Sequence, residues 1–334
     1  MIGKLFGKLF VLVVFYLLVS AFIYTTSYIA LSKKKFINLP GFKSIQKNLY
    51  WNSQFGFVEV WQNKSDCIRY DKDLIYVPKI GSCKYKNAEF DTILNFTANG
   101  RLMPKVNNSK NETILVTGDS HAMGWGVNDN ETFSHLLQSS LETQVYNLAV
   151  SSYGTVREVM RLNKSDLLKN SDILIIQYHE NDIRENQNFY DIDKLKNDEK
   201  FSKLNESKNI SFEELIKFIF KTYKSSLRLI FTDITGLFVK TKKEINFDDH
   251  YSVLLKELKN IKNFEEKKII VFFSNGPEAR FFNFPEGYDL NYKNVYFANI
   301  KLNKEDHFFL DQHPNAIGHR KIAIQLEKIL KDNY

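Results

Sequence analysis

The feature that most constrains this chain is an uninterrupted apolar stretch near its start. From Leu9 to Leu31 no charged residue occurs over about 23 positions, which at 1.5 Å per residue is long enough to cross a hydrocarbon core of about 30 Å. The sequence therefore predicts a transmembrane helix as an N-terminal anchor within residues 1–35.

A cleaved signal peptide is the alternative to a retained anchor, because Lys4 and Lys8 give the stretch a basic start. The apolar part is longer than an ordinary signal-peptide core, and no Ala-x-Ala cleavage site precedes Lys33. Both observations favour the anchor. The basic residues on its two flanks nearly balance, so charge does not orient the span.

The cysteines provide the argument for orientation. Cys67 and Cys83 lie close together in the sequence, within residues 36–110. This segment is dense in turn and strand residues, which predicts a β-rich extension. Such a pair predicts a local disulfide, with two buried free thiols as the alternative. Because a disulfide needs an oxidising compartment, we expect this segment and the rest of the chain to be extracytoplasmic.

Beyond residue 110, short apolar runs of buried-strand character alternate with stretches of helical spacing. Three such runs are 114–117, 145–150 and 173–177. The alternation predicts an α/β fold with a mostly parallel sheet. Ligands bind beyond the carboxyl ends of the strands in such sheets, so Ser120, Gly154 and Asn181 are expected to converge.

Residues 189–247 interrupt this pattern with Asn, Lys, Asp and Glu among scattered aromatic residues. Within them, Phe212 to Lys240 is amphipathic to strongly apolar. We interpret the segment as a helical insertion. It could form a lid over the site, a patch that rests on the membrane, or helices that only pack against the hydrophobic core.

Four short blocks follow one another in a fixed order along residues 112–330. They are Gly118-Asp119-Ser120, the isolated Gly154, Asn181-Asp182 and Asp311-Gln312-His313-Pro314-Asn315. In this order they resemble the SGNH (GDSL-type) hydrolase family, and in particular its membrane-anchored bacterial-type members. The resemblance implies a three-layer α/β/α SGNH-like hydrolase domain over residues 111–334.

The resemblance also implies the roles of the site residues. Ser120 would be the nucleophile and His313 the base that takes its proton, since imidazole titrates near neutrality. Asp311 would fix the tautomer of His313 and stabilise the imidazolium. The oxyanion donors carried over are the backbone N–H groups of Ser120 and Gly154 and the side-chain amide of Asn181.

Two histidines depart from the family pattern. His179 stands two residues before Asn181, where relatives often have Gly, and His121 directly follows the nucleophile. Each is a candidate for substrate contact, with simple packing as the alternative. Neither has the spacing of a zinc motif, so we expect no metal and no organic cofactor.

The expected activity is that of a serine esterase that hydrolyses an acyl ester through an acyl-Ser120 intermediate. By family analogy and location, the expected substrate is an acyl ester, acetyl included, on a surface polysaccharide. The alternatives are an O-acyltransferase, a lipase or thioesterase, and a non-catalytic glycan-binding or assembly protein. The net charge of +7 comes mostly from scattered Lys without an Arg-rich stripe, which indicates a solvated surface and no nucleic-acid partner.

Overall fold

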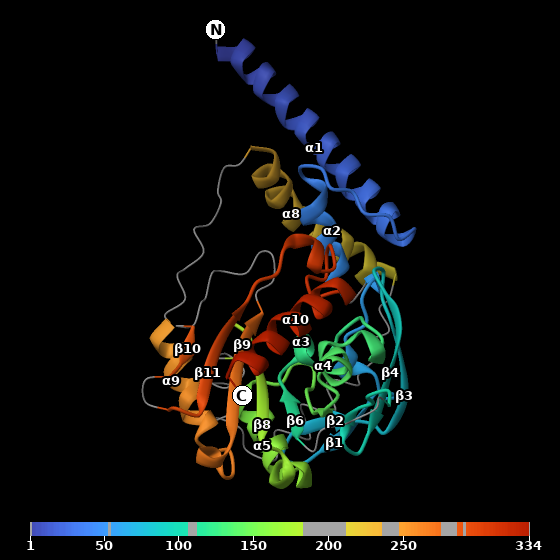
Figure 1. The fold of residues 1–334 in the computed structure, drawn as a ribbon. Helices are drawn as coiled ribbons and strands as arrows, with labels where there is room; N and C mark the ends of the chain where they lie inside the picture. Colours follow the sequence, from blue (N-terminus) through green and yellow to red (C-terminus); the bar gives the residue numbers. More distant parts are fainter. Residues whose placement is uncertain are drawn as a thin grey trace.

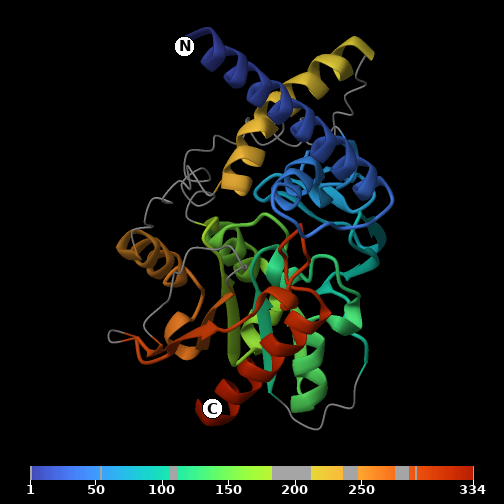
Figure 2. The same ribbon diagram turned by 90° about the horizontal axis from the view of Figure 1, so that it is seen from above.

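A long helix projects from an α/β body in the computed structural model of the chain. The structure describes residues 2–52, 55–105, 112–182, 212–235, 247–274, 286–289 and 292–333. Helix α1 (Ile2–Ser32) carries the N-terminus far from the body, and helices α2 (Phe42–Tyr50) and α8 (Phe212–Thr235) lie between α1 and the body (Figures 1 and 2).

One mixed sheet organises the body. Within the described residues it has nine strands in the order β10-β11-β9-β8-β6-β7-β5-β4-β3. The central strands β11, β9, β8, β6 and β7 are parallel, whereas β10, β5, β4 and β3 pair antiparallel. The strands are β3 (Gly81–Lys86), β4 (Asp91–Thr97), β5 (Gly100–Arg101), β6 (Thr113–Thr117), β7 (Gln144–Asn147), β8 (Ile173–Tyr178), β9 (Lys268–Ser274), β10 (Gly287–Tyr288) and β11 (Val295–Ile300).

The layers follow from the alternation of side chains along the strands. In β8, Ile173 and Ile175 join one core cluster, while Leu174 and Ile176 join the cluster on the opposite face. Helices α4 (Phe133–Leu141) and α10 (Ala316–Asn333) cover the first face, and α5 (Thr155–Lys164) and α9 (Phe247–Leu258) cover the second. The predicted α/β/α architecture is confirmed, with the parallel arrangement confined to the central strands.

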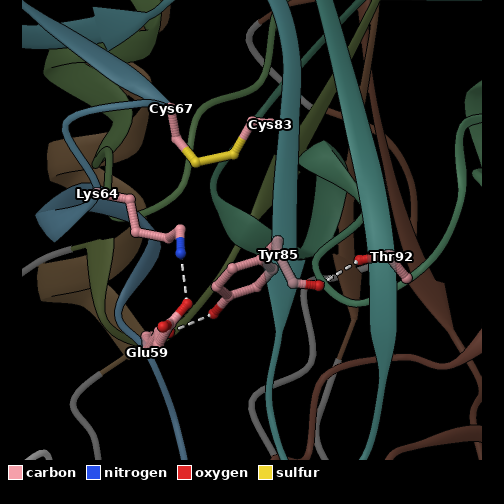
Figure 3. The surroundings of a disulfide bond; sticks show 6 residues. All are labelled: Glu59, Lys64, Cys67, Cys83, Tyr85 and Thr92. Atoms are coloured by element: carbon pink, nitrogen blue, oxygen red, sulfur yellow. Dashed lines mark hydrogen bonds and ion pairs between the residues drawn. A yellow bond between two sulfur atoms is a disulfide. The ribbon is translucent and has the colours of Figure 1, made fainter.

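Three strands of the 36–110 segment are continuous with this sheet. Strands β3, β4 and β5 extend the sheet beyond β7, and β1 (Ile68–Asp71) and β2 (Ile75–Pro78) form a separate hairpin. A disulfide joins Cys67 to Cys83, with Cα atoms 5.1 Å apart, and so ties the start of the hairpin to β3 (Figure 3). Nearby, the Tyr85 hydroxyl donates to the backbone oxygen of Glu59 at 2.8 Å.

Helix α1 contains the apolar stretch. Residues Phe6–Ser32 form a 27-residue segment long and apolar enough to cross a membrane. Its most apolar 18-residue window has a mean hydropathy of 2.4, and 11% of that window is buried within the protein. Its N-terminal half exposes large side chains such as Phe10, Leu12 and Phe15. A membrane or another apolar environment is therefore the natural surrounding of this half.

The C-terminal half of α1 packs against α8 and α2. The Tyr24 and Tyr223 rings lie 5.6 Å apart, and the Tyr223 hydroxyl donates to the backbone oxygen of Leu17 at 2.9 Å. Ile23 and Ile230 are buried in the same cluster. Of the predicted 189–247 insertion, 212–235 is the single helix α8, while 189–211 and 236–246 lie outside the described residues.

Candidate active site

The nucleophile turn lies at the carboxyl end of β6. Gly118 has φ +149°, and a Cβ there would come within 2.7 Å of the Ala122 Cβ, so only glycine fits. Asp119 caps the short helix α3 (Ser120–Met123) by accepting from the His121 N–H at 2.8 Å. These contacts set Ser120 at the first position of α3, facing the cavity described below.

A serine, a histidine and an aspartate form one hydrogen-bonded chain. The Ser120 Oγ lies 2.7 Å from the His313 Nε2, and the His313 Nδ1 is hydrogen-bonded to the Asp311 Oδ1. The loop between β11 and α10 supplies both His313 and Asp311. Asn315 ends this loop and caps α10, because its side-chain oxygen accepts from the Ile317 N–H at 2.9 Å.

Further donors converge on the second oxygen of Asp311. The Tyr50 hydroxyl donates to Oδ2 at 2.6 Å, the Trp125 Nε1 at 3.1 Å and the Asn87 Nδ2 at 3.4 Å. Trp125 also stacks on the His313 ring, with centroids 4.9 Å apart and planes 16° from parallel. Asp311 is thereby held in one rotamer with Oδ1 aimed at His313.

Glu89 holds the backbone of the same loop. Its carboxylate accepts from the Leu310 N–H at 3.1 Å and from the Asp311 N–H at 2.7 Å. Burial is the main cause that raises the pKa of Glu89 to about 7, and the nearby charge of Asp311 adds to it, while the backbone donors oppose the rise.

Arg101 braces the turn that follows the nucleophile helix. Its fully buried guanidinium pairs with Asp129 at 2.9 Å and donates to the backbone oxygens of Met123, Gly124 and Val127 at 2.6 Å each. Because these groups have no access to water, loss of the guanidinium would leave buried carbonyl oxygens without their donor.

A cavity of about 570 Å³ opens above this chain of residues. The site residues predicted from the sequence that line this cavity are Ser120, His121, His179, Asn181, Asp311 and His313. The site straddles β6 and β8, the neighbouring strands at which the order of the parallel sheet reverses, where ligands bind in open α/β sheets.

Asn181 is oriented by its own loop. The His179 Nδ1 is hydrogen-bonded to the Asn181 Oδ1, so the amide presents its Nδ2 as the donor. The buried Asp182 accepts from the His179 N–H at 3.2 Å and orders the turn. The loop therefore holds a directed side-chain donor at the cavity wall.

Gly154 lies away from the cavity wall. In the loop that contains Gly154, the described residues that line the cavity are Ser151 and Ser152. Gly154 itself is the N-cap residue of α5. Ser152 has φ +61°, in the left-handed region that non-glycine residues seldom occupy. Of the residues in this turn, Ser151 and Ser152 line the cavity, and Gly154 is not among the lining residues.

The two additional histidines form a row of rings with the catalytic candidate. His121 lies 4.6 Å from His179 and 4.9 Å from His313, measured between ring centroids. The His121 Nδ1 is 3.2 Å from the Ser274 Oγ. Burial, followed by the neighbouring histidines, lowers the pKa of His121 well below its usual value, so this ring is neutral near pH 7.

Several residues that shape the site were not predicted from the sequence. Most of them lie in the segment of residues 36–110, for which the sequence predicts only a β-rich extension. No local motif marks them, because each acts through a contact with a residue far away in the chain. They are Tyr50, Asn87, Glu89, Arg101 and Trp125.

No group of three or more His, Cys, Asp and Glu residues in the described part of the chain is arranged to hold a metal ion. The three histidines whose rings form a row, His121, His179 and His313, all line the cavity. The serine, histidine and aspartate chain contains a nucleophile, a base and an orienting carboxylate, which are the groups that acyl transfer requires.

No family model and no curated protein matches the chain. Among solved structures, a carbohydrate esterase family 2 enzyme from Corynascus thermopiles (Myceliophthora fergusii) is similar at 13% identity and a TM-score of 0.38, over 70% of this chain and 69% of that one. An active-site mutant of a family two carbohydrate esterase from Clostridium thermocellum is similar at 10% identity and 0.36, over 70% and 67%.

A lipolytic protein of the G-D-S-L family from Desulfitobacterium hafniense is similar at 9% identity and a TM-score of 0.35, over 66% of this chain and 99% of that one. All three likenesses are distant. The chemistry argued for this chain therefore rests on its own sheet order and on the geometry around Ser120.

Proposed function

We propose that the chain is a membrane-anchored serine ester hydrolase of the SGNH type. The observation that carries this proposal is the hydrogen-bonded chain from the Ser120 Oγ through the two ring nitrogens of His313 to Asp311. A nucleophile, a base and an orienting carboxylate in this order are the arrangement by which serine hydrolases activate a hydroxyl group.

The reaction proceeds in two halves. His313 takes the Ser120 proton at Nε2 while Oγ attacks the ester carbonyl carbon, and the resulting tetrahedral intermediate expels the alcohol, which receives that proton. Water then attacks acyl-Ser120 with His313 again as base, and the carboxylic acid leaves as Ser120 regains its proton. Asp311 stabilises the imidazolium in both halves through its bond to Nδ1.

The oxyanion of each tetrahedral intermediate needs fixed donors. We assign two to the Ser120 backbone N–H and the Asn181 Nδ2. The third belongs to the loop of residues 151–154, and the cavity lining favours the backbone N–H of Ser152 over that of Gly154. Loss of one such donor typically lowers the rate by about 10² to 10³.

The proposed substrate is a short acyl ester, acetyl foremost, on a surface polysaccharide. The cavity lining supports this class, because it includes the polar side chains of Gln62, Ser151, Ser152 and Gln312 beside the triad. A long-chain lipase or thioesterase needs an extended apolar channel beside its serine. Helix α8, the candidate lid, supplies none of the described residues that line this cavity.

The retained anchor is part of the same proposal. A cleaved signal sequence is not expected to be built into the fold, whereas the C-terminal half of α1 packs against α8 and α2 through Ile23, Tyr24 and Leu31. With α1 in the bilayer and a disulfide in the body, the catalytic domain is proposed to work on the extracytoplasmic side.

The test combines a fluorophosphonate probe with p-nitrophenyl acetate, butyrate and octanoate. The full chain should be labelled on Ser120 and should hydrolyse acetate fastest. Ser120→Ala should lose labelling and lower kcat/KM by about 10³-fold or more. Ser139→Ala, an exposed serine on α4, serves as the matched control.

Each other outcome has a definite meaning. Undiminished hydrolysis by Ser120→Ala would contradict the nucleophile assignment. Preference for octanoate would move the substrate toward lipids, and labelling without turnover would favour acyl transfer to an acceptor hydroxyl. Neither labelling nor turnover in the wild-type protein would overturn the enzyme proposal.

A further inference from the structure

A second hollow adjoins the catalytic cavity along helix α2. It has a volume of about 550 Å³ and borders the catalytic cavity at Lys47 and Trp51, which line both, while Leu229 of α8 lines its other side. We call it the α2 groove. Its lining is Ser44, Lys47, Asn48, Trp51, Asn52 and Leu229.

The α2 groove is one face of a helix. Ser44, Lys47 and Asn48 stand on α2, and Trp51 is its C-cap residue, so these four keep the i, i+3, i+4, i+7 spacing that places side chains on a single stripe. Asn52 follows directly after the helix. The opposite face of α2 is buried through Ile45, Leu49 and Tyr50, and Tyr50 is the residue that donates to Asp311. The same helix therefore supports the triad and lines the groove.

The junction between the two hollows is held in place. Trp51 donates from its Nε1 to the Leu310 backbone oxygen at 3.3 Å, and its side chain remains 39% exposed. The Lys47 Nζ donates to the Gln312 Oε1 at 2.6 Å, next to His313. An indole anchored by its N–H presents its ring to a ligand at little cost in side-chain entropy.

We infer that the α2 groove binds the glycan chain that carries the ester, beyond the sugar whose acyl group lies at Ser120. This inference rests on the proposed function. Hydroxyl, amide and ammonium side chains match sugar hydroxyl groups, which both donate and accept hydrogen bonds. The exposed indole offers a flat apolar surface to the C–H face of a sugar ring.

The alternative occupant, a fatty acyl chain, does not match the lining. Such a chain needs a continuous apolar surface, and only Trp51 and Leu229 are apolar among the groove residues. Helix α2 has 9 residues, which at 1.5 Å per residue extend over about 13 Å. That length exceeds a single sugar ring, so the groove accommodates a chain and not a monosaccharide.

The test measures how catalytic efficiency depends on glycan length. Full-length protein in detergent micelles is assayed with p-nitrophenyl acetate and with O-acetylated xylo- and galacturono-oligosaccharides of one to six units. In at least one series, kcat/KM is expected to rise about tenfold from monomer to hexamer, the gain equivalent to about 1.4 kcal/mol of added binding. Dividing each value by kcat/KM for p-nitrophenyl acetate on the same preparation removes differences in active fraction.

Variants of the groove separate its contribution from the chemistry. Trp51→Ala and Asn48→Ala should flatten the length dependence of this ratio, and Trp51→Phe should restore most of it because the flat ring remains. Tyr288→Ala is the matched control, since Tyr288 is a similarly exposed aromatic residue, 44% exposed, on β10 and not in the groove. It should keep the wild-type length dependence.

Binding without turnover completes the test. Xylohexaose and hexagalacturonate are titrated calorimetrically into Ser120→Ala protein with and without Trp51→Ala. If Trp51→Ala weakens the binding, the result supports glycan binding in the α2 groove, even if the ester chemistry is assigned wrongly. Two results would overturn the inference: neither hexasaccharide binds, or the length dependence is unchanged in Trp51→Ala and Asn48→Ala. If p-nitrophenyl acetate hydrolysis still depends on Ser120 in that case, the proposed function stands.

Discussion

At the scale of single residues, the site is organised around the carboxylate of Asp311. Tyr50, Asn87 and Trp125 donate to its Oδ2, and its Oδ1 is bonded to His313. Hydrogen bonds to a charged group are stronger than those between neutral groups, and this cluster is buried from water. The result is an imidazole fixed in position before a substrate arrives.

Asn181 gives a residue-scale prediction about the oxyanion. Because its amide is directed by His179 toward the cavity, Asn181→Ala should lower kcat by about 10² to 10³ and leave KM nearly unchanged. Steady-state kinetics with p-nitrophenyl acetate checks this, with the exposed Asn99→Ala as control. An effect confined to KM would contradict an oxyanion role.

Glu89 gives a second residue-scale prediction, about pH. The folded protein raises the pKa of Glu89 from 4.5 to about 7, so between these values it holds a proton that the unfolded chain has released. The stability contributed by this group is complete below about pH 4.5 and is lost as pH rises through about 7. The free energy of unfolding should therefore fall over this range more steeply in the wild type than in Glu89→Gln.

Urea unfolding at intervals from pH 4.5 to 8 measures that difference. Both proteins share every other titrating group, so only the slope attributable to Glu89 should differ. Parallel pH dependences of the two proteins would show that Glu89 titrates normally in the folded state.

At the scale of elements, the segment of residues 36–110 is a structural part of the α/β body. Its strands β3, β4 and β5 continue the sheet beyond β7, and its helix α2 delivers Tyr50 to Asp311. The hairpin of β1 and β2 contacts the loop that follows β7, since the Tyr76 hydroxyl donates to the Ser151 backbone oxygen at 2.7 Å. Disturbing this segment should therefore affect the catalytic cavity.

The disulfide of this segment gives the element-scale prediction. Cys67 and Cys83 are 16 positions apart, and closing a loop of about that length contributes about 3 kcal/mol. The Cys67→Ser and Cys83→Ser double variant should unfold in urea with a free energy lower by about that amount. Since both cysteines are buried, maleimide labelling must be done in denaturant, where the wild-type protein should label only after reduction. Labelling without reductant would contradict the disulfide.

At the scale of the whole molecule, α1, α8 and α2 form one assembly that packs against the α/β body. Ile23 of α1, Leu49 of α2 and Ile230 of α8 are buried in a single cluster, which Leu310, next to Asp311, also joins. The body is therefore packed directly against α1, without a long linker. With α1 as the proposed anchor, the body should act close to the membrane surface.

This arrangement predicts that the anchor is retained. The full chain should remain in the membrane pellet after alkaline carbonate extraction, and mass spectrometry of the purified protein should recover residues 9–31. Replacing Leu12 and Phe15 with Lys should release it, because charged side chains at the centre of a span cost about 2.5 to 3.5 kcal/mol each. A soluble mature form that begins after residue 32 would establish cleavage instead.

The α/β alternation could be predicted because it is local in the sequence, and so are the short motifs that supply the proposed triad. Ser120 ends one strand run, Asn181 follows another, and Asp311 and His313 share one short loop. Carboxyl ends of parallel strands meet at the same edge of the sheet, so short motifs at those ends converge without long-range information. Local reasoning does not extend to the turn at residues 151–154, because which of its residues line the cavity, Ser152 and not Gly154, depends on how the folded turn is placed.

The sequence by itself determined the α/β alternation, the apolar helix α1 and the motifs around Ser120, because periodicity and turn residues record local structure. Only the tertiary structure decided that Tyr50 and Asn87 bind an aspartate 261 and 224 positions away, that β3 to β5 join the hydrolase sheet, and that α8 packs on α1. Such contacts depend on how whole elements pack, and no stretch of neighbouring residues encodes them.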